Sequence, residues 1–411
     1  MLFSDTRISI RFGGKMEAYL DYNATTPLDP LVAEEMRPFL SGEFGNASSF
    51  HKKGQAARNA VELARERIAD FLEIEPGDLI FTSGGTEADN LALKGTLERQ
   101  ASTTNRRHLV VSTIEHQAVL HPAQTLEKNG FKVSYVPVTG DGLVDLDALK
   151  SVVTDETALV SIMHANNETG VIQPIEEIAR IAHAKGALFH TDAVQSFGKI
   201  PINIEKTGID LMTISAHKIC GPKGAGALYI RKGLKIKAAL HGGHQEKNIR
   251  PGTENVAAIA GFGRAAELAA KNQKEESAGV LRLRDKLFSG LKESISGIQL
   301  NGDLGKRVTN TLNISFEGLD GETLLMNLDL KNIYVSTGSA CTAGSVEPSH
   351  VLIAMGLSDK LARAAIRFSL GRFTTEREID YALAEIPSIV ERLRKASTEK
   401  NADRHSLPSS F

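Results

Sequence analysis

The stretch of sequence that decides the fold is DLMTISAHKICGPKGAGALYI, from Asp210 to Ile230. It contains a β-run that ends at Ser215, a turn rich in Gly and Pro, and a second β-run from Gly226. Too few residues separate the runs for a helix, so we expect these two strands to be antiparallel. Lys218 directly follows the first run. A lysine held rigidly at a sheet edge can form a Schiff base, although this motif alone more often marks a surface lysine.

Upstream of this stretch, short β-runs alternate with amphipathic helical patterns. The runs are residues 79–83, 109–113, 132–137, 158–163 and 187–192, and the helical patterns include residues 54–72, 87–100, 117–129 and 175–185. Strands that alternate with helices are typical of a parallel sheet covered on both faces. Together with the two runs of residues 210–230, the pattern predicts an α/β fold with a mainly parallel seven-stranded sheet.

The pattern changes after Ile230. A Gly-rich loop (241–255) leads into a long helix from residue 256 to about 296, and strand-like runs at 311–316 and 366–369 precede a last helix at 375–395. This part predicts a smaller α+β domain. We therefore expect a large domain of residues 28–274, a small domain of residues 18–27 and 275–395, an N-terminal extension (1–17) and a flexible tail (396–411).

Composition and charge exclude several classes of function. The 411 residues are 41% hydrophobic and 24% charged, and the net charge of −2 provides no basic field for nucleic acid or an acidic membrane. No apolar run approaches the roughly 18 residues that a membrane helix needs. With two cysteines and no visible secretory signal, we expect a cytoplasmic protein with reduced thiols. Residues 1–15 faintly resemble a transit peptide, but we interpret them as an extension before Met16.

Polar side chains stand at the ends of several predicted strands. Gly85 and Thr86 open a helix after residues 79–83, which indicates either an anion site or a capped helix without a ligand. Asp192 ends another run and could pair with a protonated ring nitrogen or cap a helix, and Gln195 follows it. His116 comes after a third run, where a packed or solvated histidine is the more common outcome, and Asn167 comes after a fourth.

These groups point to one cofactor when they are taken together. Ligands bind outside the carboxyl ends of the strands in open α/β sheets, so we expect these side chains to lie close together. Ser215 and His217 beside Lys218 are further donors for a phosphate. Phosphate contacts, a carboxylate partner for a pyridine nitrogen and a Schiff-base lysine are what pyridoxal 5′-phosphate (PLP) requires. The combination favours Lys218 as a cofactor anchor over a surface lysine.

Here the chain resembles the NifS/IscS-like cysteine desulfurases, class V of the PLP-dependent aminotransferase superfamily. The resemblance runs from about Tyr19 to Arg394. Its motifs are YLDYNATTP (19–27), FGNAS (44–48), TSGGTEADN (82–90), NNE (166–168), SAHK (215–218), STGSAC (336–341) and IRFSLGR (366–372). The resemblance implies PLP-transferase fold type I, a homodimer, and conversion of L-cysteine to L-alanine with release of its sulfur.

The resemblance also implies a role for each matching residue. Lys218 would anchor the cofactor, Asp192 would bind its ring nitrogen and His116 would stack on the ring. Gln195 and Asn167 would hold the ring oxygen side and the bound amino acid. The phosphate would be held by Gly85, Thr86, Ser215 and His217, with Thr253 from the other subunit. Arg367, helped by Asn46, would grip the substrate carboxylate, for which a bidentate arginine is independently suited.

Cys341 lies among small, turn-prone residues, VSTGSACTAGSVEP (335–348), which indicates a mobile loop. A free cysteine is more often a small buried hydrophobe, but these flanks are polar. By resemblance, the Cys341 thiolate takes the sulfur and becomes a persulfide, with His116 as acid or base. At Cys220 relatives usually carry an aromatic residue. We interpret Cys220 as a packing residue, with a second reactive thiol as the lesser alternative.

Other functions remain open at this point. A selenocysteine lyase or another PLP β-lyase would use the same cofactor set, and a sulfur carrier or scaffold would need only the flexible loop and tail. His241, His244 and His350 lack convincing ligand spacing, so we predict no metal site. The expected partners are L-cysteine and a sulfur acceptor. By resemblance the acceptor would be an iron–sulfur scaffold protein, with no direct nucleic-acid or membrane partner; housekeeping and nitrogen-fixation pathways both fit.

Overall fold

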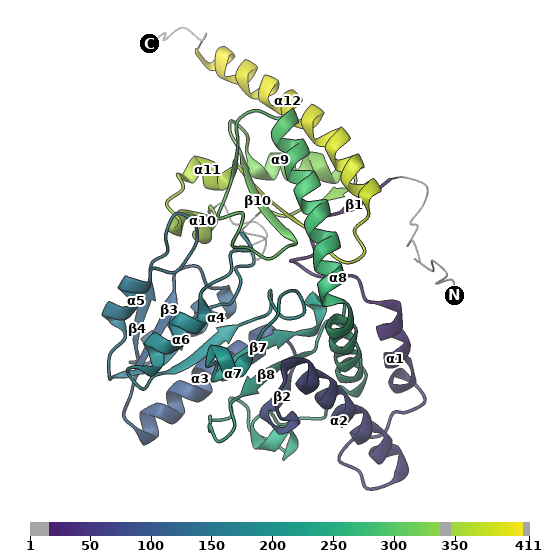
Figure 1. Ribbon diagram of the computed structural model, residues 1–411, viewed down its shortest axis with the longest axis vertical. Coiled ribbons are helices and arrows are strands. Elements are labelled where there is room, and N and C mark those ends of the chain that lie inside the picture. The colour runs from purple at the N-terminus through teal and green to yellow at the C-terminus, as the bar shows by residue number, and fades with distance from the viewer. Residues whose placement is uncertain (1–15, 338–346, 406–411) are drawn as a thin grey trace.

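The computed structural model describes residues 16–337 and 347–405 (Figure 1). Residues 1–15 of the predicted extension, Cys341 and the last six residues of the predicted tail lie outside these ranges. No helix within them is long and apolar enough to cross a membrane.

A seven-stranded mixed sheet forms the centre of the larger part of the molecule. In spatial order its strands are β2 (Leu79–Thr82), β8 (Gly226–Ile230), β7 (Leu211–Ser215), β6 (Leu188–Asp192), β5 (Thr157–Ser161), β3 (His108–Ser112) and β4 (Lys132–Val136). Strand β8 is antiparallel to both of its neighbours, and all other pairs are parallel. The predicted sheet and the predicted antiparallel pair are both confirmed.

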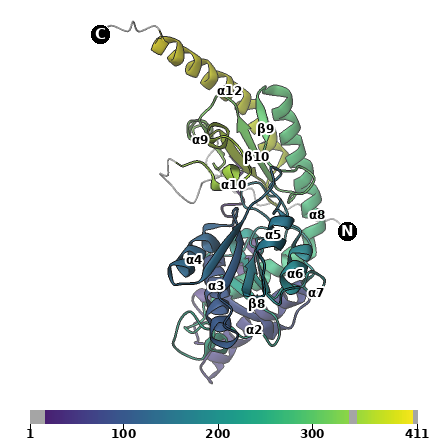
Figure 2. The same cartoon turned by 90° about the vertical axis from the view of Figure 1, so that its left-hand side faces the viewer.

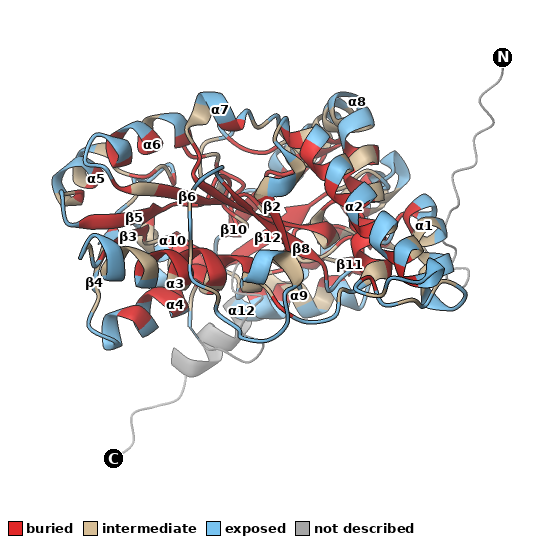
Figure 3. Cartoon of the chain, turned by 90° about the horizontal axis from the view of Figure 1, so that it is seen from below, coloured by how far each residue is buried: buried red, intermediate tan, exposed pale blue. Residues whose placement is uncertain are grey.

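Helices cover both faces of this sheet (Figure 3). The helices of this part are α1 (Pro30–Leu40), α2 (Lys52–Leu72), α3 (Gly85–Thr103), α4 (Gln117–Lys128), α5 (Leu146–Val152), α6 (Ile175–His183) and α7 (Ile204–Thr207), with short 3₁₀ turns η1 (Pro76–Asp78), η2 (Ala216–Lys218) and η3 (Gln245–Asn248). Helices α3 and α4 bury apolar side chains against one face, and α2 and α6 against the other. Strands covered on both faces explain why β3, β5, β7 and β8 are buried along their whole length.

The smaller part lies in the upper half of Figure 2. It has its own apolar core. Its elements are β1 (Ala18–Tyr19), β9 (Ile298–Leu300), β10 (Thr311–Phe316), α9 (Gly321–Asp329), β11 (Ile333–Tyr334), α10 (His350–Ala354), α11 (Asp359–Arg363), β12 (Ala365–Ser369) and α12 (Glu376–His405). Strand β10 pairs antiparallel with β12 and β9, while β1 pairs parallel with β11.

One long helix, α8 (Val256–Ser294), joins the two parts (Figure 1). Its first half, with Phe262, packs into the core of the large sheet, and its second half, with Leu287 and Leu291, packs into the small core. The predicted domain division at residue 274 therefore falls inside a continuous helix. The division itself stays a prediction.

The last helix differs from the sequence-based expectation. Helix α12 continues to His405, past the predicted end at Lys395 and into the segment that we expected to be a flexible tail. No Gly or Pro interrupts residues 396–405, so nothing in that stretch terminates the helix that precedes it.

Candidate active site

Lys218 lies in η2, directly after β7, where a tight turn reverses the chain toward β8. A Cβ atom on Gly221 would lie 2.7 Å from the carbonyl oxygen of Ala216, so the turn requires glycine there. The Lys218 ammonium donates to the carbonyl oxygens of Asn23 and Ala24, the latter at 2.9 Å. The lysine is therefore held on a fixed backbone at the sheet edge, as a Schiff-base lysine needs to be.

The two carbonyls belong to a segment that we call the N-terminal strap, residues 20–29, which runs from β1 to α1 and passes the edge of the sheet (Figure 1). The strap also contacts the turn around Lys218. The Thr25 hydroxyl lies 3.1 Å from Nδ1 of His217, and the Thr26 hydroxyl donates to the His217 carbonyl and accepts from the Cys220 N–H. Residues 23–26 of the strap thus contact three residues of the turn, His217, Lys218 and Cys220, and hold it in place.

Asp192 ends β6 beside this turn. Its Oδ1 accepts a hydrogen bond from the backbone N–H of Val194 at 2.8 Å. Burial raises the pKa of Asp192 to about 6, while that hydrogen bond and the charge of Lys218 act in the opposite direction. The result is a buried carboxylate at the mouth of the sheet, which is suited to pair with a protonated pyridine nitrogen.

A site for a phosphate lies where α3 begins. The first residue of α3 is Gly85, and a Cβ atom there would lie 4.0 Å from Cβ of Ser215, so the first turn of α3 and the end of β7 are adjacent. The Ser215 hydroxyl is buried and has no hydrogen-bond partner among the described residues. An unpartnered hydroxyl beside the free N–H groups of a helix N-terminus fits the phosphate of PLP.

His116 occupies the N-cap position of α4, and its Nδ1 accepts from the N–H of Ala118 at 3.1 Å. Burial, followed by the charge of Lys218, lowers the pKa of His116 to about 4. The imidazole is therefore neutral near pH 7 and held in one orientation, which suits an aromatic partner for the cofactor ring.

Arg367 and Asn167 meet where β12 approaches the seven-stranded sheet. Arg367 on β12 is 3% exposed, and its Nη1 donates to the carbonyl oxygen of Asn167 at 3.1 Å. Gln195 is engaged differently from the role that the resemblance implies. Its amide donates to the carbonyl of Asn23 at 3.0 Å and accepts from Lys199 at 2.8 Å, so it is bound to the strap.

Three predicted site residues are not joined to the others by any contact that the structure describes. Asn46 lies exposed in the loop between α1 and α2, where its side chain accepts from the N–H of Ser48 at 2.8 Å. Thr253 is exposed on the Gly-rich loop before α8. Cys341 lies outside the described residues, so its placement stays a prediction.

The loop that carries Thr253 is firmly attached to α2, β2 and α3. Arg65 of α2 pairs with Glu246 at 2.6 Å, and both side chains are almost fully buried. Glu246 also accepts from the N–H of Phe81, and Arg250 pairs with Glu87 of α3 at 2.7 Å. An exposed Thr253 on an anchored loop is compatible with a contribution to a second subunit.

The reasoning from strand ends missed the strap and Lys199. A single strap residue, Asn23, forms hydrogen bonds with Lys218, Gln195, Lys199 and Asn167. The sequence signal for the strap was the motif YLDYNATTP (19–27), on which the family resemblance partly rests. The resemblance did not imply a site role for any residue of that motif. Lys199 is a second amine near Lys218, and burial, followed by the charge of Lys218, lowers its pKa to about 7.

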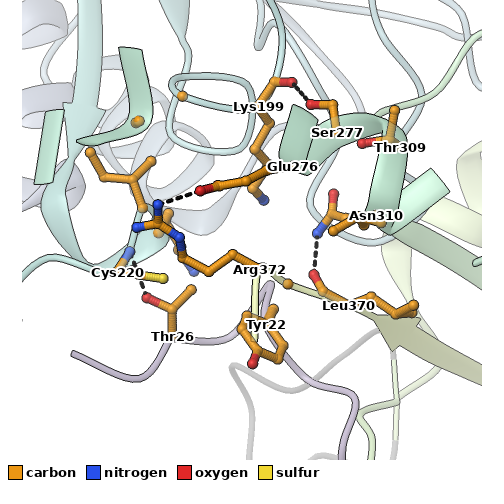
Figure 4. A pocket seen from close by; sticks show the side chains of 16 residues that line it. Tyr22, Thr26, Lys199, Cys220, Glu276, Ser277, Thr309, Asn310, Leu370 and Arg372 are labelled. Carbon is orange, nitrogen blue, oxygen red and sulfur yellow. Dashed lines mark hydrogen bonds and ion pairs between the residues drawn. The ribbon is translucent and has the colours of Figure 1, made fainter. Parts of the chain in front are cut away.

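A pocket lined in part by Lys218 lies between the strap, α8 and the residues that follow β12 (Figure 4). Cys220, Arg372 and Glu276 line it, and Arg372 pairs with Glu276 and with Asp29 of the strap. Cys220 is 4% exposed, and burial raises the pKa of its thiol to about 11. A protonated, buried thiol favours the packing interpretation of Cys220.

This burial predicts that Cys220 is poorly reactive. In a C341S variant, where Cys220 is the only thiol, we expect iodoacetamide at pH 7.5 to alkylate the native protein at least about 100-fold more slowly than free cysteine, because little thiolate forms. Mass spectrometry over time measures the rate. The same protein in urea, where Cys220 is exposed, is the control and should react normally. Native labelling as fast as that of free cysteine would contradict the prediction.

The comparisons with known proteins agree with this geometry. The Aminotransferase class-V family matches residues 18–382. Cysteine desulfurase IscS of Dictyoglomus turgidum is 49% identical over 386 residues, which cover 94% of this chain and 98% of that protein. Cysteine desulfurase IscS of Methanosarcina thermophila is 48% identical and covers 92% of this chain and 93% of its own length.

Solved structures give the same result. A structure described as a NifS-like protein superposes with a TM-score of 0.86 at 43% identity and covers 92% of this chain and 100% of its own. A structure described as SspA in complex with cysteine has a TM-score of 0.78 at 36% identity, with 87% and 100% covered. The chain belongs to the aminotransferase class-V family, and within it to the NifS/IscS-like cysteine desulfurases.

Proposed function

We propose that this protein is a PLP-dependent cysteine desulfurase that converts L-cysteine to L-alanine and leaves the sulfur as a persulfide on Cys341. The observation that carries the proposal is Lys218, fixed at the sheet edge between the strap and the buried Asp192, within a chain that matches cysteine desulfurases over almost its whole length.

The residues that would hold PLP come from several strand ends of one sheet edge. When bound, PLP supplies an electron sink for negative charge at the substrate Cα. Asp192 would pair with the ring nitrogen, and His116 would lie against the ring. The phosphate would be held by Gly85, Thr86, Ser215 and His217 of this chain, and by Thr253 of a second copy. Gln195 and Asn167 would bind the ring oxygen side once the amide of Gln195 releases the strap.

The site residues bind the substrate and move its protons. Arg367, with Asn167 and Asn46, would bind the carboxylate of L-cysteine and so set the direction of its side chain. The amine of Lys218 would remove the α-proton, and the carbonyls of Asn23 and Ala24 lie where they can hold the resulting ammonium. His116, neutral near pH 7, would exchange a proton with the reacting sulfur.

Cys341 would accept the sulfur. Its thiolate attacks the sulfur of the substrate, an S–S bond forms, and the bond between that sulfur and Cβ of the substrate breaks with its electron pair. A proton then replaces sulfur on Cβ, so that L-cysteine and one thiol become L-alanine and one persulfide without any external oxidant. The persulfide passes to an acceptor.

The assembly and partners follow from the same proposal. We propose a homodimer in the cytoplasm, in which Thr253 reaches the site of the partner, and an iron–sulfur scaffold protein or another sulfur carrier as acceptor. Two separate apolar cores support a division into a large domain (28–274) and a small domain (18–27 and 275–395) that meet at the site.

One experiment tests the function directly. The protein loaded with PLP is incubated with L-cysteine without reductant, and alanine and protein mass are measured together. We expect one alanine for each sulfur atom added to the protein, with the sulfur on the peptide that contains Cys341. Absence of alanine would refute the proposed function, and alanine without protein-bound sulfur would refute the persulfide.

A further inference from the structure

Arg367 has a carboxylate partner within its own chain. Its Nη2 lies 2.8 Å from Oδ1 of Asp21 in the strap, and its Nη1 lies 3.1 Å from the Asn167 carbonyl oxygen. The Arg367 side chain is 4% exposed, whereas that of Asp21 is 19% exposed. The guanidinium that we propose binds the substrate carboxylate is thus buried in an ion pair with the strap.

The backbone that carries Asp21 is rigidly attached to β12. Asp21 forms a parallel bridge with Ser369, the Ser369 N–H donates to Leu20 at 2.8 Å, and the Tyr22 N–H donates to Ser369 at 3.0 Å. Because Arg367 lies on the same strand β12, strap and strand keep the two side chains at a fixed spacing.

The backbone of Arg367 is also held by hydrogen bonds to the segment that follows β11. Its backbone N–H and C=O pair with Ser336, at 2.7 and 3.2 Å, just before the stretch that contains Cys341. The Nε atom of Arg367 is buried and has no hydrogen-bond partner among the described residues. Within those residues, the orientation of the guanidinium therefore depends on Asp21 and on the Asn167 carbonyl.

We propose that Asp21 is a positioning residue for the reaction: its carboxylate fixes Arg367 so that the remaining N–H donors of both terminal nitrogens face the carboxylate of the amino-acid substrate. A guanidinium has five donors, and one contact on each terminal nitrogen leaves a second donor on each for a bidentate bond. Without Asp21 the long side chain has to be ordered when the substrate binds, which weakens binding. The inference rests on the proposed function, because it concerns the same carboxylate site.

The test separates charge from contact at position 21. In D21A both are lost, and we expect the KM for L-cysteine to rise about tenfold or more while kcat changes less than about threefold, the pattern of lost substrate binding. In D21N the amide oxygen can still accept from Arg367 without the charge, so an intermediate rise in KM is expected. D21E, which restores the charge, should lie closer to the wild type than D21A.

Asp29 offers a matched control in the same strap. It pairs with Arg372 at 3.1 Å, an arginine that follows β12, and both side chains are nearly buried, at 10% and 11% exposure. Asp29 also caps α1 by accepting from the N–H of Leu31. We therefore expect D29A to lower the melting temperature at least as much as D21A but to leave KM within about twofold of the wild type. Equal KM values for D21A and the wild type, or equal changes of KM in D21A and D29A, would show that Asp21 contributes only to stability.

Two further outcomes are informative. A fall in KM in D21N would show that Asp21 competes with the substrate for Arg367 and would overturn the positioning role. The affinity of the loaded protein for L-alanine, measured by calorimetry, tests the same contact without turnover. If the wild type binds L-alanine but does not process L-cysteine, the proposed function fails, and the D21A affinity still decides the role of Asp21.

Discussion

Replacement of Lys218 by alanine is expected to reduce alanine formation from L-cysteine by about 10⁴-fold or more, because one substitution removes both the cofactor anchor and the base. Among residues 16–337 and 347–405 no other amine occupies the same point: Lys199 is nearby, but its amine is bound by Gln195 and Asn23. Alanine production over hours measures the residual rate, and the visible absorbance of the purified protein shows whether cofactor is retained.

Lys223 is the matched control for this experiment. It lies in the same turn, five residues further along, but its side chain is exposed to solvent. K223A should therefore retain the wild-type rate and absorbance. A K218A variant that folds normally and still turns over L-cysteine at the wild-type rate would remove Lys218 from the mechanism.

Replacement of Cys341 by alanine is expected to lower sulfide release in the presence of a thiol reductant by about 10³-fold or more, while L-cysteine still binds within a few-fold of the wild-type affinity. The reason is that Cys220, the only other thiol, is buried and protonated and cannot take over. Sulfide is measured by a colorimetric assay and binding by the change in cofactor absorbance.

The control for Cys341 is C220S, in which we expect wild-type sulfide release and persulfide formation. Normal sulfide release by C341A would refute the persulfide role. Together with a turnover of selenocysteine far above that of cysteine, it would instead favour a selenocysteine lyase, the alternative that uses the same cofactor set without a thiol.

The sheet and much of the candidate site could be predicted because their signals are local. Each strand is a short apolar run, and the end of a parallel strand places its polar neighbours at a common edge. Lys218, Asp192 and Ser215 follow from this rule alone, and the structure places them at that edge. The short distance between the runs of β7 and β8 was enough to predict that they are antiparallel.

The strap could not be predicted in this way because its contacts are distant in sequence. Asp21 and Arg367 are 346 residues apart, and Asn23 and Lys218 are 195 residues apart. Strand β1 has only two residues, too few for any periodic pattern. The hydrogen bond between Gln195 and Asn23 could not be predicted for the same reason. The sequence places a side chain at a strand end, but it does not show which distant residue the fold brings next to it.

The attachment of the early strap to the late strand β12 has a consequence for synthesis on the ribosome. At roughly 5–20 residues per second, Asp21 leaves the ribosome about 20–70 s before Arg367, 346 residues later. Strands β10 and β12 and the stretch around Cys341 are likewise translated late, after the whole seven-stranded sheet. The sheet edge that carries Lys218 and Asp192 is therefore complete in the nascent chain well before Arg367, the proposed carboxylate-binding residue, has been translated.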